Sequence, residues 1–430
     1  MVAVPRNKYK PRLIDRIVEQ HLKAFGGIEI AGTMWSGKTW TALEHGTSAV
    51  TLDNTQARQL AEMAPEALLA GEYPRVIDEW QLVPSIWDTA RHQIDQAAGE
   101  RGLFILTGSS RPSKDEVHHT GSGRISRLKM RPMSLQETGE SSGAVSLSAL
   151  FDGVFKPCGG DPDLFRLAYA ISRGGWPGSL DLEPDLATLV PTQYVDALVT
   201  AEDTNAPESE DGLRRFLQAL ARNTGSAPKI NTLAQDMRFT ENDRPTEMGR
   251  RKTQALIEFF ANRFVIEPSA GWDAPIKSPS RLRVKPRYDF ADPSIPCAIL
   301  GLNEQSILGN MQVFGQLFEQ LCLRDLRVYA SVMPQAKPDT VRYYRDADNL
   351  EVDAIVELRD GRWAGIEIKL GANKVPDAES SLLRLKKKIA ANPFAQNAEP
   401  SFLMVLVGAG EFAYQLPSGV YVVPIRCLGA

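Results

Sequence analysis

Cysteine is scarce in this chain of 430 residues. The four cysteines lie far apart and form no CxxC pair: Cys158, Cys297, Cys322 and Cys427. Neither a disulfide framework nor a zinc ribbon is therefore indicated. Because free thiols persist in reducing compartments, we expect a cytoplasmic protein.

Other absences narrow the functional class. No stretch approaches the roughly 18 to 20 consecutive apolar residues of a membrane span, and the first residues lack the apolar core of a secretory signal. The formal net charge of −4 excludes a uniformly basic nucleic-acid-binding surface but allows local basic patches. All five histidines precede residue 120, so chemistry later in the chain must use carboxylates, lysine, arginine, hydroxyls or cysteine.

The length predicts two or three domains, and 43% hydrophobic with 24% charged residues is the balance of a globular protein. In the first expected domain, residues 1–145, short apolar runs alternate with helical patterns. Strands are expected at 27–31, 49–52, 75–77 and 103–107, and helices at 12–25 and from Lys38. This alternation predicts an α/β domain with a parallel sheet covered on both faces.

A phosphate-binding loop is predicted between the first strand and the helix from Lys38. The pattern G-x-x-x-x-G-K-[ST] is fitted by Gly32, Thr33, Met34, Trp35, Ser36, Gly37, Lys38 and Thr39. Backbone N–H groups of such a loop fold around phosphate oxygens at the following helix N-terminus. Lys38 would reach the β- and γ-phosphates, and the Thr39 hydroxyl would bind Mg²⁺. The alternative is an ordinary glycine-containing turn.

Two more strand ends carry polar side chains suited to the same site. The strand at 75–77 leads into Asp78, which would hold Mg²⁺, and Glu79, which would orient or deprotonate the attacking water. Many strands end in acids, but beside a phosphate loop this pair indicates an NTP hydrolase. The strand at 103–107 leads to Ser109, where a γ-phosphate sensor would lie; ordinary turn chemistry is the alternative.

Together with residues 12–15, 123–125 and 130–135, these motifs resemble a family of prokaryotic AAA-class ATPases with a C-terminal domain of uncharacterised function. The resemblance implies ATP rather than GTP, and the sequence has no Asn-Lys-x-Asp guanine motif. It also implies dimers or rings, and it places the strand at 103–107 between the other two site strands. Arg124 or Arg127 would supply a cation to the transferring phosphate, within the chain or across subunits. A solvated or carboxylate-paired arginine is the alternative.

Residues 146–211 are expected to form a helical lid or linker. Residues 212–300 read as three helices followed by a basic hairpin, the outline of a winged helix, and the family resemblance supports that fold. Four basic residues alternate in the hairpin and would share one face of a strand: Arg281, Arg283, Lys285 and Arg287. Nucleic-acid phosphates are the partner expected for such a row. A solvated edge strand that deters aggregation is the alternative.

The last expected domain, residues 301–430, contains Asp353, Glu367 and Lys369 in the Asp…Glu-x-Lys pattern of the restriction-endonuclease-like fold, which the family's last domain also resembles. A three-residue hairpin loop at 359–361 would set Asp353 opposite Glu367, with Lys369 on the same sheet face. Opposed acids repel unless they share a cation, so this pairing favours Mg²⁺ or Mn²⁺, with Glu319 as a further ligand. Lys369 would position or deprotonate water. A solvated hairpin, or a two-residue loop that shifts the register, is the alternative.

The sequence therefore predicts an α/β multidomain protein: an AAA-like P-loop NTPase, a winged helix and a restriction-endonuclease-like domain. One hypothesis is an ATP-hydrolysing protein coupled to a nucleic-acid-binding, Mg²⁺-dependent nuclease. The other is a nucleotide-driven switch that binds DNA or a protein and does not cleave. In the second case Glu367→Ala would leave the cellular effect unchanged, whereas Lys38→Ala would abolish it.

Overall fold

The computed structural model describes residues 8–111, 121–200, 206–225, 228–238, 240–241, 244–275, 278, 284–338 and 340–430. The chain forms two compact units. Unit 1 comprises Met1–Pro132 with Asn262–Val265, and unit 2 comprises Met133–Ala261 with Ile266–Ala430. The division falls at Pro132 rather than at the expected boundary of 145. The other expected boundaries, at 211 and 300, lie within unit 2 and stay predictions.

Unit 1 is built on a five-stranded sheet in the order β2-β3-β4-β1-β5, with every pairing parallel. Its strands are β1 (Gly27–Gly32), β2 (Ser48–Thr51), β3 (Arg75–Asp78), β4 (Phe104–Gly108) and β5 (Ile125–Met130). The four expected strands are present, and β4 lies between β1 and β3, as the family resemblance implied. The edge strand β5 is an addition to the expected set.

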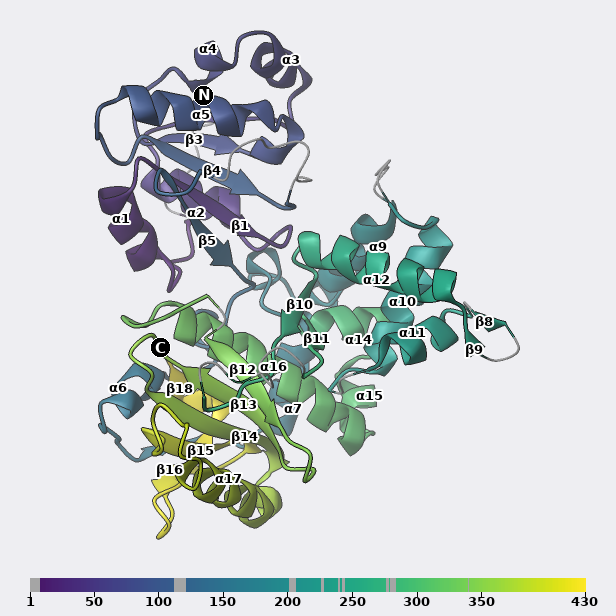
Figure 1. Cartoon of the computed structure of the whole chain (residues 1–430). Helices are drawn as coiled ribbons and strands as arrows, with labels where there is room; N and C mark the ends of the chain where they lie inside the picture. The colour runs from purple at the N-terminus through teal and green to yellow at the C-terminus, as the bar shows by residue number, and fades with distance from the viewer. Residues whose placement is uncertain are drawn as a thin grey trace. The chain divides into compact units, whose positions relative to one another are not determined.

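Helices cover both faces of this sheet, as Figure 1 shows for the part at the top of the view. The helices are α1 (Asp15–Ala24), α2 (Lys38–His45), α3 (Thr55–Met63), α4 (Pro65–Leu69), η2 (Trp80–Leu82) and α5 (Ser85–Gln96). Successive strand residues enter opposite cores, because side chains alternate along a strand. Val76 and Ile105 pack with Val18 of α1, whereas Ile77 and Leu106 belong to the core of α4 and α5.

The first part of unit 2 is mainly helical. Its elements are α6 (Leu147–Phe151), α7 (Leu164–Arg173), η3 (Pro177–Ser179), α8 (Pro184–Ala187), α9 (Leu189–Thr200), α10 (Glu210–Arg222), α11 (Ile230–Asp236), β8 (Thr240–Glu241), β9 (Arg244–Pro245), α12 (Glu247–Asn262), β10 (Ile266–Ser269), β11 (Arg287–Phe290) and α14 (Ser294–Leu300). Three helices, α10 to α12, precede the antiparallel pair β10–β11, which is the expected order. The assignment to the winged-helix class stays a prediction.

The hairpin does not present the expected row of basic side chains. Arg281 and Arg283 lie outside the described residues. Lys285 is exposed, but Arg287 is buried and forms an ion pair with Glu319. The prediction that Arg287 faces nucleic acid is therefore wrong, because β11 turns this side chain toward the interior of unit 2.

The last part of unit 2 is a seven-stranded mixed sheet in the order β12-β13-β14-β15-β17-β16-β7, whose strands from β12 to β17 are green to yellow in Figure 1. Its elements are α15 (Glu304–Leu308), α16 (Met311–Ser331), β12 (Val341–Arg345), β13 (Glu351–Glu357), β14 (Trp363–Gly371), η4 (Ala372–Lys374), α17 (Val375–Ala390), β15 (Phe402–Ala409), β16 (Phe412–Gln415), β17 (Tyr421–Pro424), η5 (Ile425–Cys427) and β18 (Leu428–Gly429). β14, β15 and β17 are parallel, and β13 and β16 run antiparallel to their neighbours. Leu382, Leu385 and Ile389 of α17 share a core with Trp363 and Val405 of the sheet.

Part of the expected linker belongs to this C-terminal region. β7 (Cys158–Gly159) pairs antiparallel with β16, and β6 (Val145–Ser146) pairs parallel with β18. These pairings join residues far apart in the sequence, which is why residues 133–159 belong to unit 2. In the described part of the chain, no helix is both long and apolar enough to cross a membrane.

Candidate functional site

The phosphate loop joins β1 to α2 and depends on its two glycines. A Cβ on Gly32 would lie 2.0 Å from the carbonyl oxygen of Met130, so only glycine fits beside β5. Gly37 has a φ of 96°, a left-handed conformation that suits glycine, and α2 begins at the next residue. The loop therefore leads into a helix N-terminus, where backbone N–H groups can hold phosphate oxygens.

Lys38 is buried beside the loop, with 4% of its surface exposed, and its Nζ donates to the carbonyl oxygen of Thr33 at 2.8 Å. Burial lowers the pKa of Lys38 to about 8, and the carboxylates of Glu79 and Asp78 oppose that shift. A buried ammonium with a neutral carbonyl partner gains from an incoming phosphate, because an opposite charge replaces its lost hydration.

Hydroxyl groups hold Asp78 at the end of β3. Thr39 Oγ1 donates to Asp78 Oδ1 at 2.8 Å, and Thr107 Oγ1 of β4 donates to the same oxygen at 2.5 Å. Burial raises the pKa of Asp78, and these hydrogen bonds oppose the shift. The hydroxyl and the carboxylate expected to hold Mg²⁺ are therefore already adjacent. Two oxygen ligands from the protein, completed by phosphates and water, suit Mg²⁺.

Glu79 follows Asp78 in a left-handed conformation, with a φ of 56°. Its carboxylate is held at both oxygens: Ser109 Oγ donates to Oε1 at 2.9 Å, and Gln81 Nε2 donates to Oε2 at 2.5 Å. Ser109, expected as a phosphate sensor, therefore contacts the carboxylate that is expected to orient or deprotonate the attacking water. The hydrogen bonds fix the direction of the Glu79 carboxylate, which is what a residue that orients water requires.

A buried acid behind this turn was missed by the sequence analysis. Glu29 lies in the middle of β1, and its Oε1 accepts a hydrogen bond from Trp80 Nε1 at 3.1 Å. Burial raises the pKa of Glu29, although the nearby Arg127 opposes the shift. The contact anchors the residue next to Glu79 to the strand that carries the phosphate loop. A single acid within an otherwise apolar strand was the available signal.

Arg12 belongs to the motifs that resemble the AAA-class family, and its contacts in the structure indicate a role. Its Nη1 donates to the carbonyl oxygen of Ser36 in the phosphate loop at 2.7 Å, and its Nη2 donates to that of Arg131 at 2.7 Å. Asp15 caps this segment by accepting from the Arg12 N–H at 2.8 Å. Arg12 therefore ties the loop to the residue that follows β5, and no spacing rule could have shown this.

Arg124 does not lie near the phosphate loop of its own chain. It precedes β5, and its carbonyl oxygen accepts from Gly27 N at the start of β1, whereas the loop follows the other end of that six-residue strand. About 20 Å of strand separate the two edges. Arg124 Nε pairs with Asp95 Oδ1 at 2.7 Å, and Arg127 Nε lies 3.1 Å from Glu29 Oε2. A role for Arg124 within the chain is therefore wrong; a role across subunits stays a prediction.

The C-terminal hairpin has the expected register. Ala354 pairs with Ile366, which leaves a three-residue loop at 359–361 and sets Asp353 opposite Glu367. Lys369 then points toward the same acids. Its Nζ lies 3.2 Å from Asp353 Oδ2 and 2.5 Å from Glu367 Oε2. The three residues of the Asp…Glu-x-Lys pattern therefore meet.

Two acids of this cluster, Glu367 and Glu319, have a raised pKa. Burial raises the pKa of Glu367 to about 8, repulsion from Asp353 adds to the shift, and the contact with Lys369 only partly opposes it. Burial also raises the pKa of Glu319 to about 7, with Asp353 contributing, while Arg287 opposes the shift.

The expected three-carboxylate metal site is not preassembled. Among the residues that the structure describes, no group of three or more His, Cys, Asp or Glu is arranged to hold a metal ion. Arg287 pairs with Glu319, and Lys369 bridges Asp353 and Glu367, so cations of the protein take the positions that a metal would need.

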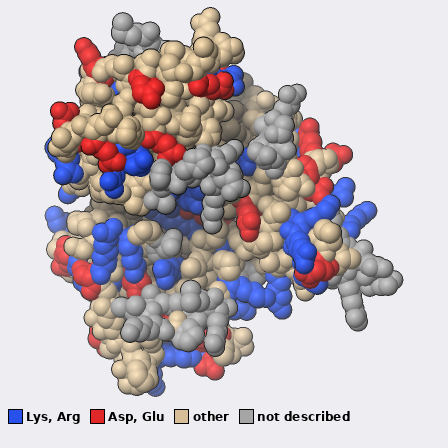
Figure 2. Space-filling model, turned by 45° about the horizontal axis from the view of Figure 1, so that its top comes forward, with Lys and Arg blue, Asp and Glu red and all other residues tan. Residues whose placement is uncertain are grey.

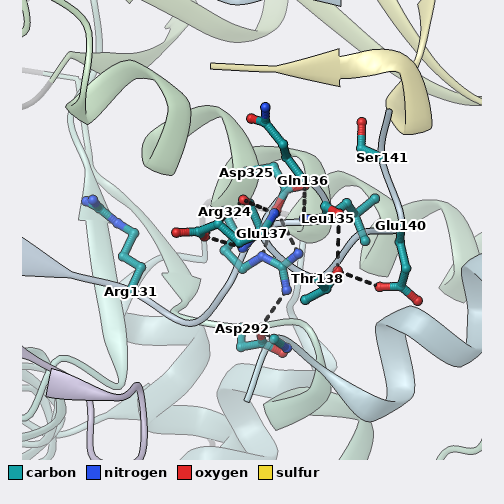
Figure 3. Close-up of polar contacts among 12 residues, drawn as sticks. Arg131, Leu135, Gln136, Glu137, Thr138, Glu140, Ser141, Asp292, Arg324 and Asp325 are labelled. Carbon is teal, nitrogen blue, oxygen red and sulfur yellow. Dashed lines mark hydrogen bonds and ion pairs between the residues drawn. The ribbon is translucent and has the colours of Figure 1, made fainter. Parts of the chain in front are cut away.

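A second buried charge network, shown in Figure 3, anchors the start of unit 2. Arg324 Nη2 pairs with Asp325 Oδ1 at 2.7 Å, and its Nη1 pairs with Asp292 Oδ2 at 2.8 Å. Asp325 Oδ2 also accepts from Leu135 N at 3.0 Å, and Asp292 Oδ2 accepts from Gly175 N at 3.0 Å. The network therefore fixes the segment that follows Met133 to α16 and to the chain before α14.

Comparisons with known proteins divide the chain into three matched regions. Residues 27–139 match the family described as an AAA domain. Residues 164–306 match a Domain of unknown function (DUF8612), and residues 314–428 match a Domain of unknown function (DUF4143). No curated protein sequence matches the chain.

Two solved structures are similar to the chain at 14% sequence identity. The Walker-type ATPase PABY2304 of Pyrococcus abyssi has a TM-score of 0.42, covering 66% of this chain and 94% of its own. The ORC1 protein of Aeropyrum pernix, solved in complex with DNA, has a TM-score of 0.30, covering 69% of this chain and 95% of its own.

The AAA match and the parallel sheet confirm the predicted P-loop NTPase fold of the N-terminal region. They support nucleotide binding and hydrolysis, with the Mg²⁺ that such sites ordinarily use. The restriction-endonuclease-like and winged-helix assignments stay predictions.

Proposed function

We propose that unit 1 is an Mg²⁺-dependent ATPase whose nucleotide cycle controls the state of unit 2. One observation carries the proposal: Lys38, Thr39, Asp78, Glu79 and Ser109 converge where parallel strands end. Lys38 would bind the β- and γ-phosphates, and Glu79, held by Ser109, would orient the attacking water and accept its proton. Mg²⁺, held by Thr39 and Asp78, would neutralise phosphate charge.

The test compares MgATP binding and phosphate release in the wild type and Lys38→Ala. The exposed Lys23→Ala, on α1, is the matched control. We expect Lys38→Ala to lose both binding and turnover, because the phosphates lose their buried cation, while the control behaves as wild type. Equal turnover in Lys38→Ala and wild type would refute the ATPase site.

A second candidate function concerns unit 2, and the register of β13 and β14 favours it. We propose that Asp353, Glu367 and Lys369 form a nuclease site, in which a divalent metal would be held by the two acids and Lys369 would position water. Metal entry requires Lys369 to move from its bridging position. The three helices and the hairpin of residues 212–300 are proposed to bind nucleic acid as a winged helix.

The alternative is a nucleotide-driven switch that binds DNA or a protein partner without cleavage. The ion pairs of Lys369 and Arg287 support it, because they already neutralise the acids of the cluster. On the face drawn in Figure 2, acidic side chains lie among the basic ones. Any nucleic-acid contact on that face is therefore local, since phosphates are repelled by interspersed acids.

The test incubates the protein with plasmid and single-stranded DNA, with Mg²⁺ or Mn²⁺, and with or without ATP. Glu367→Ala is compared with Glu351→Ala, an exposed acid of the same hairpin. Cleavage that is lost in Glu367→Ala but kept in Glu351→Ala supports the nuclease. If Lys38→Ala also loses cleavage, ATP controls it. No cleavage under any condition, with ATP hydrolysis intact, supports the switch.

A further inference from the structure

The tryptophans of this chain divide sharply by exposure. Of the seven tryptophans, five are buried at 3% exposure or less. The two exceptions are Trp35, at 47%, and Trp40, at 40%. Both belong to the phosphate loop or to the first turn of α2, on either side of Lys38. An exposed tryptophan often indicates a binding surface, because contact between its large apolar side chain and water is unfavourable.

The backbone of Trp35 adds an independent sign of function. Its φ of 61° is left-handed, which is a genuine outlier for a bulky residue. Glycine would take this conformation without strain, and it does so nearby at Gly37. Residues with strained backbone conformations persist mainly at ligand and active sites, so we expect the ring of Trp35 to make a contact there that glycine cannot make.

The geometry of the loop determines which part of a nucleotide these rings can meet. Thr33, Ser36 and Lys38 are buried on the inner side, where the phosphates bind. A nucleoside triphosphate must therefore leave the loop on its solvent side, with the base pointing outward. Trp35 and Trp40 are the half-exposed aromatic side chains of this segment.

We propose that Trp35 and Trp40 bind the nucleoside end of the ligand by stacking against its base. The inference rests on the proposed binding of ATP and adds the part of the site that distinguishes a nucleoside triphosphate from bare phosphate. Every base has an aromatic face, so stacking alone gives affinity without choosing strongly between adenine and guanine. In this proposal, the base of the bound nucleotide occupies the surface formed by the two rings.

The test uses two ligands that share the phosphate chain and differ in the base. ATP and inorganic tripolyphosphate, each with Mg²⁺, are titrated into the wild type, Trp35→Gly and Trp40→Ala. Phe394→Ala, which removes an exposed aromatic ring of unit 2, is the control. Trp35→Gly keeps the left-handed backbone without strain, so the loop should stay intact.

We expect each variant to bind ATP about tenfold more weakly, the loss typical of one stacked base, while tripolyphosphate binds as in the wild type. ATP, but not tripolyphosphate, should quench the wild-type tryptophan fluorescence. Equal weakening for both ligands would mean that the rings only support the loop, and unchanged affinities would mean that they touch neither ligand. A variant that changes self-association but not the ratio of the two affinities would assign the surface to a second copy. Each of these three results overturns the inference.

The same titrations distinguish failure of the stacking contact from failure of the proposed ATP-binding site. If the wild type and Lys38→Ala bind neither ligand, the phosphate site itself is wrong and the inference falls with it. If the wild type binds both ligands equally and Lys38→Ala binds neither, the phosphate site stands and only the stacking contact is wrong.

Discussion

The phosphate site and the C-terminal acid cluster use the same side chains, a lysine and two acids, but differ in what satisfies their charges. In unit 1, neutral groups satisfy them: Lys38 donates to a backbone carbonyl, and Asp78 and Glu79 accept from hydroxyls and an amide. In unit 2, cations satisfy them: Lys369 contacts both hairpin acids, and Arg287 holds Glu319.

This difference decides how easily each site accepts a ligand. Exchanging a neutral hydrogen bond costs about 1 kcal/mol, whereas leaving a buried charge without its partner costs about 3 to 5 kcal/mol. The phosphate site is therefore prepared for an anion with its own cation. In the acid cluster, ion pairs must break before a metal ion can bind.

The largest effect is expected when the carboxylate of Glu79 is removed. Glu79→Gln should lower ATP turnover by about 10²- to 10⁴-fold, the usual loss of a general base, and leave ATP affinity nearly unchanged. Phosphate release and nucleotide titration measure the two quantities. The exposed Glu44→Gln, on α2, is the control, and a parallel loss of affinity in Glu79→Gln would contradict the assigned role.

The next largest effect is expected when an ion pair of the acid cluster is broken. Arg287→Met should lower the free energy of unfolding by about 3 kcal/mol, because Glu319 then lies buried without its cation. Adding Glu319→Gln should restore most of the loss, whereas Arg222→Met, an exposed arginine of α10, should cost little. Urea denaturation measures all four proteins. If the double variant is as unstable as the single one, the cluster is not held by charge neutralisation.

A smaller effect should appear as a dependence of stability on pH. Because the folded pKa of Glu367 is about 8 and its ordinary value is 4.5, the folded state binds the proton more tightly than the unfolded state. Stability is therefore expected to fall between about pH 5 and 8, by on the order of a few kcal/mol.

Urea denaturation from pH 5 to 9, with a chelator present, measures this slope. Glu367→Gln cannot ionise and should flatten the slope, whereas Glu351→Gln should not. A slope of the opposite sign in the wild type would show that the contact with Lys369 outweighs burial.

The smallest effect concerns the contact of Ser109 with Glu79. Ser109→Ala removes one hydrogen bond of about 1 kcal/mol, so turnover should fall about fivefold. In a Glu79→Ala background, Ser109→Ala should change turnover little further, since the oxygen that accepts its hydrogen bond is already removed. An additive loss would instead favour direct contact of Ser109 with the γ-phosphate.

Local patterns in the sequence were sufficient for the parts of both sites that depend on neighbouring residues. The spacing from Gly32 to Thr39 located the loop, and Asp78 and Glu79 ended the expected strand. The hairpin register followed from a turn of three residues, because side chains alternate along both strands.

The parts that were wrong or missed depend on tertiary position. Arg287 reads as a basic surface residue until β11 is placed against α16. Arg124 reads as a site arginine until β5 is known to run parallel to β1, which puts its start at the opposite edge. Arg12 contacts Ser36 and Arg131, and no rule of spacing links these three residues.

The pairing of β7 with β16 has a consequence for synthesis of the chain. Unit 1 contains nearly all of its own partners by residue 132 and can fold while later residues are still being added. Cys158, in β7, emerges before its β16 partner and before Cys427, whose Sγ donates to the carbonyl oxygen of Gly159 at 3.2 Å. At about 5 to 20 residues per second, that wait lasts roughly a quarter of a minute to one minute. During that interval the nascent chain carries the folded sheet of unit 1 together with a strand β7 whose edge is not yet paired with β16.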